Sequence, residues 1–212
     1  MKTIIFDMYG VIIKESKGNF IPYTYKHFPE SEHDRIKEQI WKEHLFTKAG
    51  NGEITSDEFL TALGYEDPQF HMRDYLDNHL TIDNDFYTFA EKVKHIYNFA
   101  LLSNDVSDWS KHITEHYSLN EYLPIKIVSA DVHCRKPDAR IYEIALERLG
   151  APASECIFID NTVANLQMAS NFGIRTILFN RDGEVYDGEV VYSFGELFEK
   201  IRVDSYPPES LY

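Results

Sequence analysis

Short apolar runs rich in β-branched and aromatic residues recur along the chain, and most are followed by a turn or polar cluster and then by a helical period. Because nearly every position in these runs is apolar, both faces of each strand should be buried, which is typical of a parallel sheet covered by helices on each side. The pattern therefore predicts an α/β fold. The predicted strands are Thr3–Phe6, Phe99–Leu102, Ile125–Val128, Cys156–Ile159 and Thr176–Phe179.

Helical periods separate these strands. Residues 86–96 place apolar side chains at helical spacing. The stretch from Pro137 to Leu149 has proline in its first turn and is followed by Gly150, where a left-handed cap is expected. A further helix is expected between Asp160 and Gly173. The alternation predicts a Rossmann-like core.

The alternation stops between the first strand and residue 85, where three helical patterns replace it. Ile36, Ile40 and Leu45 mark one helix, a capping box at residues 55–58 opens a second, and Asp67-Pro68 opens a third. We expect a core formed by residues 1–15 and 84–212, an inserted helical cap of residues 16–83, and a loosely ordered tail over residues 203–212.

Composition and charge argue against several classes of function. Among 212 residues, 21 Lys and Arg face 35 Asp and Glu, a net charge of −14. The chain has no basic stripe for nucleic acid and no run of roughly 20 apolar residues to span a membrane. Its two cysteines, Cys134 and Cys156, fit no disulfide or metal framework, so we expect a cytoplasmic protein. Because the net charge is negative, an anionic substrate would need a locally positive site. The sequence does not set the oligomeric state.

Polar residues follow four of the predicted strands at their carboxyl ends, where ligands bind in folds of this class. They are Asp7, Ser103-Asn104, Lys136, which follows the third strand at a distance, and Asp160-Asn161. Each alone has an ordinary structural explanation, since Ser103-Asn104 or Asp160 could cap the helix that follows it. Their convergence would instead supply a nucleophile, hydrogen-bond donors, a cation and metal ligands.

In this order, the motifs resemble those of the haloacid dehalogenase-like hydrolase superfamily, most of whose members are Mg²⁺-dependent phosphatases. The resemblance rests on Phe6–Val11, Leu101–Asn104, Arg135–Asp138 and Phe158–Asn161, and the helical insertion is similar to the superfamily's cap. It implies a phosphatase acting on a small phosphorylated metabolite.

The resemblance also implies residue roles. Asp7 would be the nucleophile that forms an aspartyl-phosphate, and Lys136 would hold both this carboxylate and a phosphoryl oxygen. The Ser103 hydroxyl would donate to another phosphoryl oxygen, and Asn104 would add a donor or shape the loop. Mg²⁺ would be held by Asp7, the backbone carbonyl of Tyr9, and Asp160.

Tyr9 departs from the phosphatase pattern, which places an aspartate general acid here, and losing such an acid typically costs about 10²- to 10⁴-fold in rate. Haloacid dehalogenases have tyrosine followed by glycine at this place and need no metal, but typically carry serine where this chain has Asp160. A 2-haloacid dehalogenase using the same nucleophile is therefore an alternative. A catalytically weak phosphate-binding protein is another.

A third group within the superfamily, bacterial sugar-phosphate phosphatases, also lacks the second aspartate. The chain is similar to them at residues 52–55 and 135–142, which keeps the phosphatase interpretation open. Asn161 replaces a common acidic residue, so we expect weak Mg²⁺ affinity, toward the millimolar range. Five histidines lie in the insertion, and none of them shares the i, i+4 spacing of a helical zinc pair: His27, His33, His44, His71 and His79.

Overall fold

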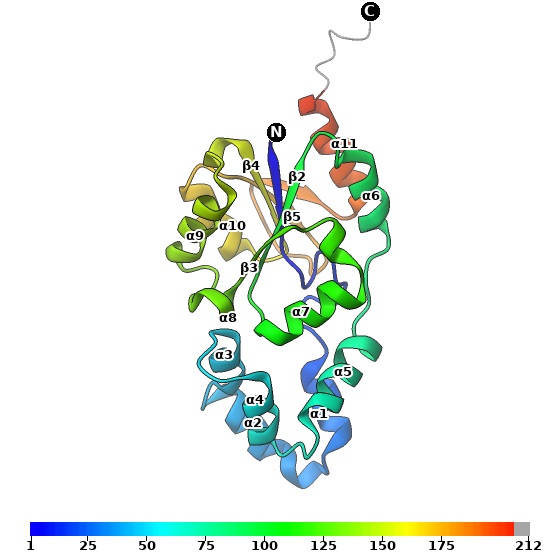
Figure 1. The fold of residues 1–212 in the computed structure, drawn as a ribbon, viewed down its shortest axis with the longest axis vertical. Helices are drawn as coiled ribbons and strands as arrows, with labels where there is room; N and C mark the ends of the chain where they lie inside the picture. Colours follow the sequence, from blue (N-terminus) through cyan, green and yellow to red (C-terminus); the bar gives the residue numbers. More distant parts are fainter. Residues whose placement is uncertain (206–212) are drawn as a thin grey trace, which may run out of the picture.

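The computed structural model describes the backbone of residues 1–205 and the side chains of residues 1–201. Its centre is a parallel sheet of six strands in the order β3-β2-β1-β4-β5-β6 (Figure 1). Five strands were predicted; the sixth is a short edge strand with an acidic first residue, which gives little apolar signal. The strands are β1 (Thr3–Phe6), β2 (Asn98–Ser103), β3 (Ile125–Val128), β4 (Cys156–Asp160), β5 (Arg175–Phe179) and β6 (Glu189–Val191).

Helices cover both faces of the sheet. Ile4 and Phe6 pack on one face with α6 (Asp85–Val93), α7 (Ser107–His116) and α11 (Phe194–Ser205). Ile5 packs on the other with α9 (Ala139–Leu149) and α10 (Val163–Asn171). Alternate residues of one strand thus enter two separate cores, which explains the continuous apolar runs. The predicted Rossmann-like α/β fold is confirmed.

The inserted helices lie together beyond the carboxyl ends of the strands (Figure 1). Where the chain enters and leaves them, the Lys14 N–H donates to the Thr81 carbonyl at 2.9 Å and the Asp83 N–H to the Ile12 carbonyl at 2.8 Å. These two hydrogen bonds join the two connecting segments, and the inserted helices lie over the carboxyl ends of the strands, where the polar residues are. The inserted helices are α1 (Phe20–His27), η1 (Glu30–Glu32), α2 (His33–Trp41), α3 (Leu45–Gly50), α4 (Ser56–Leu63) and α5 (Pro68–Asn78).

One helix prediction for the insertion was wrong, and one helix was missed. Ile36 and Ile40 belong to α2, but Leu45 opens α3, because His44 adopts a left-handed conformation with φ of 58°. The pattern also missed α1, in which Pro22 lies in the first turn, where its missing N–H has no helical partner to lose. The capping box at Thr55 and the helix start at Asp67 are as predicted.

Helix ends in the core differ in detail. Asp138 is the N-cap of α9, so Pro137 precedes that helix instead of lying in its first turn, and Gly150 forms the expected left-handed cap. The remaining short helices are η2 (Leu119–Glu121), α8 (Ser129–Val132) and η3 (Ala153–Glu155). Helix α11 continues to residue 205, beyond the expected start of the tail at residue 203, and residues 206–212 lie outside the described residues. No helix in the described part of the chain is long and apolar enough to cross a membrane.

Candidate active site

Three charged side chains meet at the carboxyl end of the sheet. The Lys136 Nζ lies 2.8 Å from Asp7 Oδ1 and 2.7 Å from Asp160 Oδ2. The side chains of Lys136 and Asp160 are 1% and 0% exposed, whereas that of Asp7 is 11% exposed. Asp7 is therefore the most exposed member of the cluster. Two carboxyl groups surround one ammonium group, so the cluster carries excess negative charge when both are ionised.

Asn104 fixes the loop that carries the lysine. Its Nδ2 donates to the Lys136 carbonyl at 2.9 Å, and its Oδ1 accepts from the Lys136 N–H at 2.8 Å. The amide thus pairs with both backbone groups of one residue, as a neighbouring strand would. Of the two roles expected for Asn104, the structure shows the shaping of the loop. The Ser103-Asn104 pair does not cap α7, whose N-cap is Val106.

Asp160 is held by the chain after β4. Its Oδ1 accepts from the Thr162 N–H at 2.7 Å, and the Asn165 Nδ2 donates to Oδ1 at 3.2 Å and to Oδ2 at 3.0 Å. Together with Lys136, these donors occupy both carboxylate oxygens. Asp160 therefore positions the lysine and supports the start of α10.

Burial dominates the electrostatics of the cluster. It raises the pKa of Asp7, with the nearby Asp160 adding to the effect and Lys136 opposing it. Burial alone would lower the pKa of Lys136, but the carboxylates of Asp160 and Asp7 outweigh it and raise that pKa. The lysine consequently stays charged, while Asp7 needs more positive charge nearby to be fully ionised at neutral pH.

Tyr9 faces a second buried acid. Its hydroxyl donates to Asp105 Oδ1 at 3.4 Å, and this oxygen also accepts from the Val106 N–H at 2.8 Å. The other oxygen, Oδ2, is buried and has no hydrogen-bond partner among the described residues. Burial raises the pKa of Asp105 to about 8. It also raises the pKa of Tyr9, so the phenol remains protonated.

A cavity of about 190 Å³ opens beside Asp7. Side chains of Phe46 from α3 and Tyr75 from α5 form part of its wall on the cap side, and Trp109 from α7 contributes from the core. The wall is thus largely aromatic, while the floor is polar. The remaining lining residues are Tyr9, Ser16, Lys17, Gly18, Asn104, Lys136, Asn161, Thr162 and Asn165.

The oxygen donors on the floor suit a hard divalent cation. Asp7 and Asn161 both line the cavity, and Gly10, in the loop after Asp7, lies beside the Asn161 side chain. A Cβ on Gly10 would lie 2.3 Å from the Asn161 Nδ2, and Gly10 has φ of +82°. Only glycine therefore allows the Asn161 amide to occupy this place beside the nucleophile loop.

The cavity receives some of the predicted site residues and not others. Asp7, Tyr9, Asn104 and Lys136 line it, whereas Asp160 lies behind Lys136. Ser103 is fully buried, and its Oγ has no hydrogen-bond partner in residues 1–201.

Sequence reasoning missed several residues of the site, among them Asp105 and Trp109. Asp105 directly follows Ser103-Asn104 at the end of β2, so its place after a strand was an available signal. Trp109 belongs to no motif, and only the three-dimensional arrangement shows that it lines the cavity.

The model of the haloacid dehalogenase-like hydrolase family matches residues 1–173, which include all of these motifs. The chain belongs to the haloacid dehalogenase-like hydrolase family. This is a hydrolase family whose members catalyse more than one reaction.

Known relatives of this chain include both 2-haloacid dehalogenases and a phosphatase. An (S)-2-haloacid dehalogenase from Pseudomonas putida is 25% identical over 201 residues, covering 88% of each chain. A phosphatase from Mycobacterium tuberculosis is 27% identical over 91 residues, 43% of this chain and 42% of that protein. The matches span 41% and 35% of the length of two further curated relatives.

A solved structure shares the fold. It is a HAD family enzyme from Bacteroides thetaiotaomicron, in complex with magnesium and inorganic phosphate. Its TM-score is 0.73 and its identity 21%, over 88% of this chain and 98% of that one.

Proposed function

We propose that this hydrolase is a Mg²⁺-dependent phosphatase that acts on a small phosphorylated metabolite in the cytoplasm. The observation that carries the proposal is the charge at the base of the cavity, where Asp7 shares the ammonium group of Lys136 with Asp160, which lies behind that lysine. A phosphate dianion would add further negative charge, so a divalent cation is needed to bring substrate and nucleophile together. The magnesium and phosphate in the related structure agree with this chemistry.

Asp7 and the backbone carbonyl of Tyr9 would hold the cation, as the sequence predicts. We propose the side-chain oxygen of Asn161 as the third protein ligand in place of Asp160, because Asn161 lines the cavity and Asp160 is occupied by Lys136. When bound, Mg²⁺ would neutralise charge on the phosphoryl oxygens and on Asp7. One carboxylate and two neutral oxygens make a weak site, consistent with half-saturation toward the millimolar range.

The residues of the chain then divide the work. An Asp7 carboxylate oxygen attacks phosphorus in line, the phosphorus–oxygen ester bond breaks, and the leaving alkoxide takes the bonding electron pair. Lys136 holds the nucleophile and a phosphoryl oxygen, in the loop fixed by Asn104. Water then attacks the phosphorus of the aspartyl-phosphate and releases inorganic phosphate and free Asp7. We propose that the Ser103 hydroxyl donates to a phosphoryl oxygen.

The leaving group is restricted because Tyr9 occupies the place of the usual general acid. Its hydroxyl already donates to Asp105, and its pKa is raised. Esters whose leaving oxygen is weakly basic, such as anomeric sugar phosphates, need the least protonation and should be the best substrates. Tyr9→Asp should raise turnover of simple alkyl phosphates; unchanged or lower turnover would count against this explanation.

The test is phosphate release from a panel of phosphomonoesters graded by leaving-group pKa, with and without Mg²⁺. We expect Mg²⁺-dependent release that is fastest for the most acidic leaving groups and absent in Asp7→Asn. Release that ignores Mg²⁺, or that survives the Asp7→Asn substitution, would refute the proposed mechanism.

The second candidate is a 2-haloacid dehalogenase, favoured by Tyr9-Gly10 and by the small, aromatic-walled cavity. In that reaction Asp7 would displace halide from carbon and form an ester that water cleaves, with no metal. Chloride release from 2-chloropropionate in the presence of a chelator would support it. A weak phosphate-binding protein would show neither activity.

A further inference from the structure

Two histidines and an aspartate meet where the cap packs on the core, and none of the three lines the cavity. His112 and His116 stand one helical turn apart on α7, and Asp77 faces them from α5. The Asp77 Oδ1 lies 2.6 Å from His112 Nε2 and 3.3 Å from His116 Nδ1. One ligand atom from each of the three side chains lies within 4.8 Å of the others.

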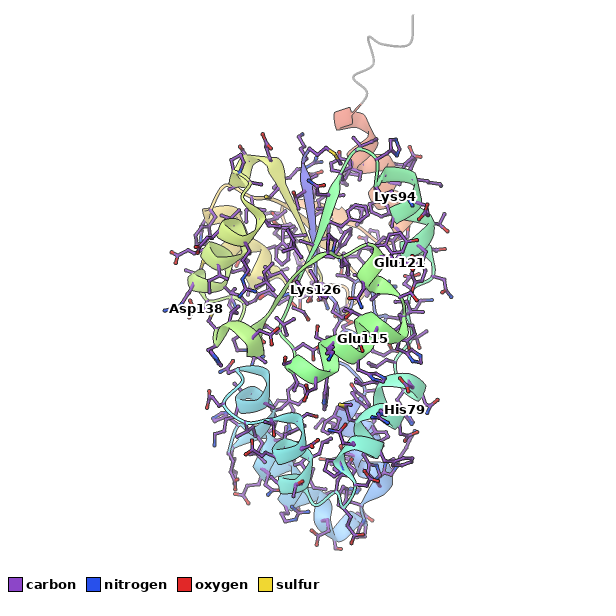
Figure 2. The ribbon with its side chains drawn as sticks, viewed as in Figure 1. His79, Lys94, Glu115, Glu121, Lys126 and Asp138 are labelled. Carbon is purple, nitrogen blue, oxygen red and sulfur yellow. The ribbon has the colours of Figure 1, made fainter. Side chains whose placement is uncertain are left out.

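The arrangement is prepared by its surroundings. The two imidazole rings stack with centroids 5.8 Å apart and planes 20° apart, so both rings are already oriented. The next residue, Tyr117, donates from its hydroxyl to the Leu80 carbonyl at 3.3 Å, which ties the end of α7 to the chain just after α5. Figure 2 labels Glu115 on α7 and His79 at the end of α5, which mark the two sides of this boundary.

The side chains are also accessible. Those of His112, Asp77 and His116 are 24%, 29% and 41% exposed, so an ion can enter and water can complete its coordination. Histidine pairs at i, i+4 with one carboxylate are a donor set for Zn²⁺ and related ions, whereas Mg²⁺ prefers oxygen alone. Tetrahedral ligand atoms about 2.1 Å from Zn²⁺ are roughly 3.4 Å apart. The His116–Asp77 distance already meets this value, and the His112–Asp77 contact needs to lengthen.

We propose that Asp77, His112 and His116 form a binding site for a first-row divalent transition metal such as Zn²⁺. The site shares no residue with the Asp7 cluster. Its ligands come from two parts of the molecule, so bound metal would join α5 of the cap to α7 of the core. Because Tyr75 and Trp109 of the same two helices line the cavity, the metal would restrain the cap over the substrate.

The first test is calorimetric titration of the full chain with Zn²⁺ in excess Mg²⁺, which fills the oxygen-rich site. We expect one Zn²⁺ per chain, and an affinity at least about tenfold weaker in Asp77→Asn and in His116→Ala. The controls His95→Ala and His27→Ala, at histidines outside the cluster, should bind as the unmodified protein does. No binding, or equal binding by Asp77→Asn and His116→Ala, would overturn the proposal.

Hydrogen exchange provides a second readout that does not depend on activity. Zn²⁺ should slow amide exchange in residues 68–78 of the unmodified protein and of His95→Ala, but not of Asp77→Asn. Unchanged exchange in α5 despite stoichiometric binding would show that the metal does not join the two parts, and the bridging site would be rejected. Circular dichroism of each variant checks that the fold is retained.

Discussion

The roles of Asp160 and Asn161 separate at the residue scale, although the two are neighbours in sequence. Asp160 is fully buried against Lys136, while Asn161 lines the cavity. We predict that Asp160→Asn lowers the free energy of unfolding by about 3 kcal/mol, because Lys136 loses a buried partner. The turnover of Asp160→Asn should fall, while the Mg²⁺ concentration that gives half-maximal activity should stay unchanged.

Asn161→Ala is the matched variant. It should raise half-saturating Mg²⁺ by about tenfold, as expected when a metal's coordination is disturbed. Phosphate release titrated with Mg²⁺ measures both variants. If Asp160→Asn weakens Mg²⁺ and Asn161→Ala does not, the ligand assignment is reversed and the original prediction of Asp160 is correct.

Asp105 predicts a pH dependence of stability. Its ordinary pKa is 3.8, and burial raises this to about 8 in the folded protein. The folded protein therefore keeps the proton at pH values where the unfolded chain has lost it. The resulting stabilisation is complete below the unfolded pKa and disappears as the pH rises from about 4 to about 8.

Asp105→Asn removes this titration. The variant should lose stability less steeply between about pH 6 and pH 9 than the unmodified protein, since an amide carries no buried charge at alkaline pH. Urea unfolding at both pH values measures the difference, with Asp108→Asn at an exposed site on α7 as control. Identical pH slopes for Asp105→Asn and the unmodified protein would show that Asp105 does not titrate in this range.

At the scale of elements, the loop between β1 and the insertion depends on one glycine. Gly10→Ala should reduce activity more than about tenfold. The new Cβ would displace the Asn161 amide, and the alanine backbone would have to adopt a positive φ. Gly173 has nearly the same φ, +81°, but has open space around it. Gly173→Ala should therefore cost about 1 kcal/mol in stability and leave activity unchanged. Equal losses of activity would mean that strain alone, without the Asn161 contact, explains the effect.

Elements with strong local patterns were predictable from the sequence, and those set by their surroundings were not. Continuous apolar strands such as β4 and the capped helix α4 carry their signals in consecutive residues. The break at His44 does not, because no neighbouring residue in the sequence marks its left-handed conformation. The short edge strand β6 likewise forms because β5 offers it a partner.

Across the whole molecule, α7 connects the cap with the core. The Trp109 Nε1 donates to the Ser56 Oγ of α4 at 2.7 Å, and both residues are buried. Ser56→Ala should lower the free energy of unfolding by about 1–3 kcal/mol, because it leaves a buried indole N–H without an acceptor. Ser107→Ala removes a solvent-exposed hydrogen bond to Asp131, and both residues belong to the core domain. It should lower the free energy of unfolding by less than about 0.5 kcal/mol. Urea unfolding compares the two; equal costs would mean that the cap contact adds nothing to stability.

The motifs at the strand ends predicted much of the candidate site, because parallel strands bring Asp7, Asn104 and Lys136 to one edge of the sheet. The sequence could not show that Asp160 turns toward Lys136, nor that Asp105 faces Tyr9, since both depend on side-chain directions set by packing. The cavity-lining side chains of the cap, Phe46 and Tyr75, belong to no sequence motif, because packing between distant segments brings them to the cavity.

The most direct test of the central claim is mass spectrometry of the peptide containing Asp7 after acid quench of a single turnover. One sample receives an aryl phosphate with Mg²⁺, and the other receives 2-chloropropionate with a chelator. The account predicts a phosphoryl group on Asp7 in the first sample and unmodified Asp7 in the second. A propionate ester on Asp7 in the second sample, with no phosphoryl adduct in the first, would contradict the phosphatase assignment and establish the dehalogenase.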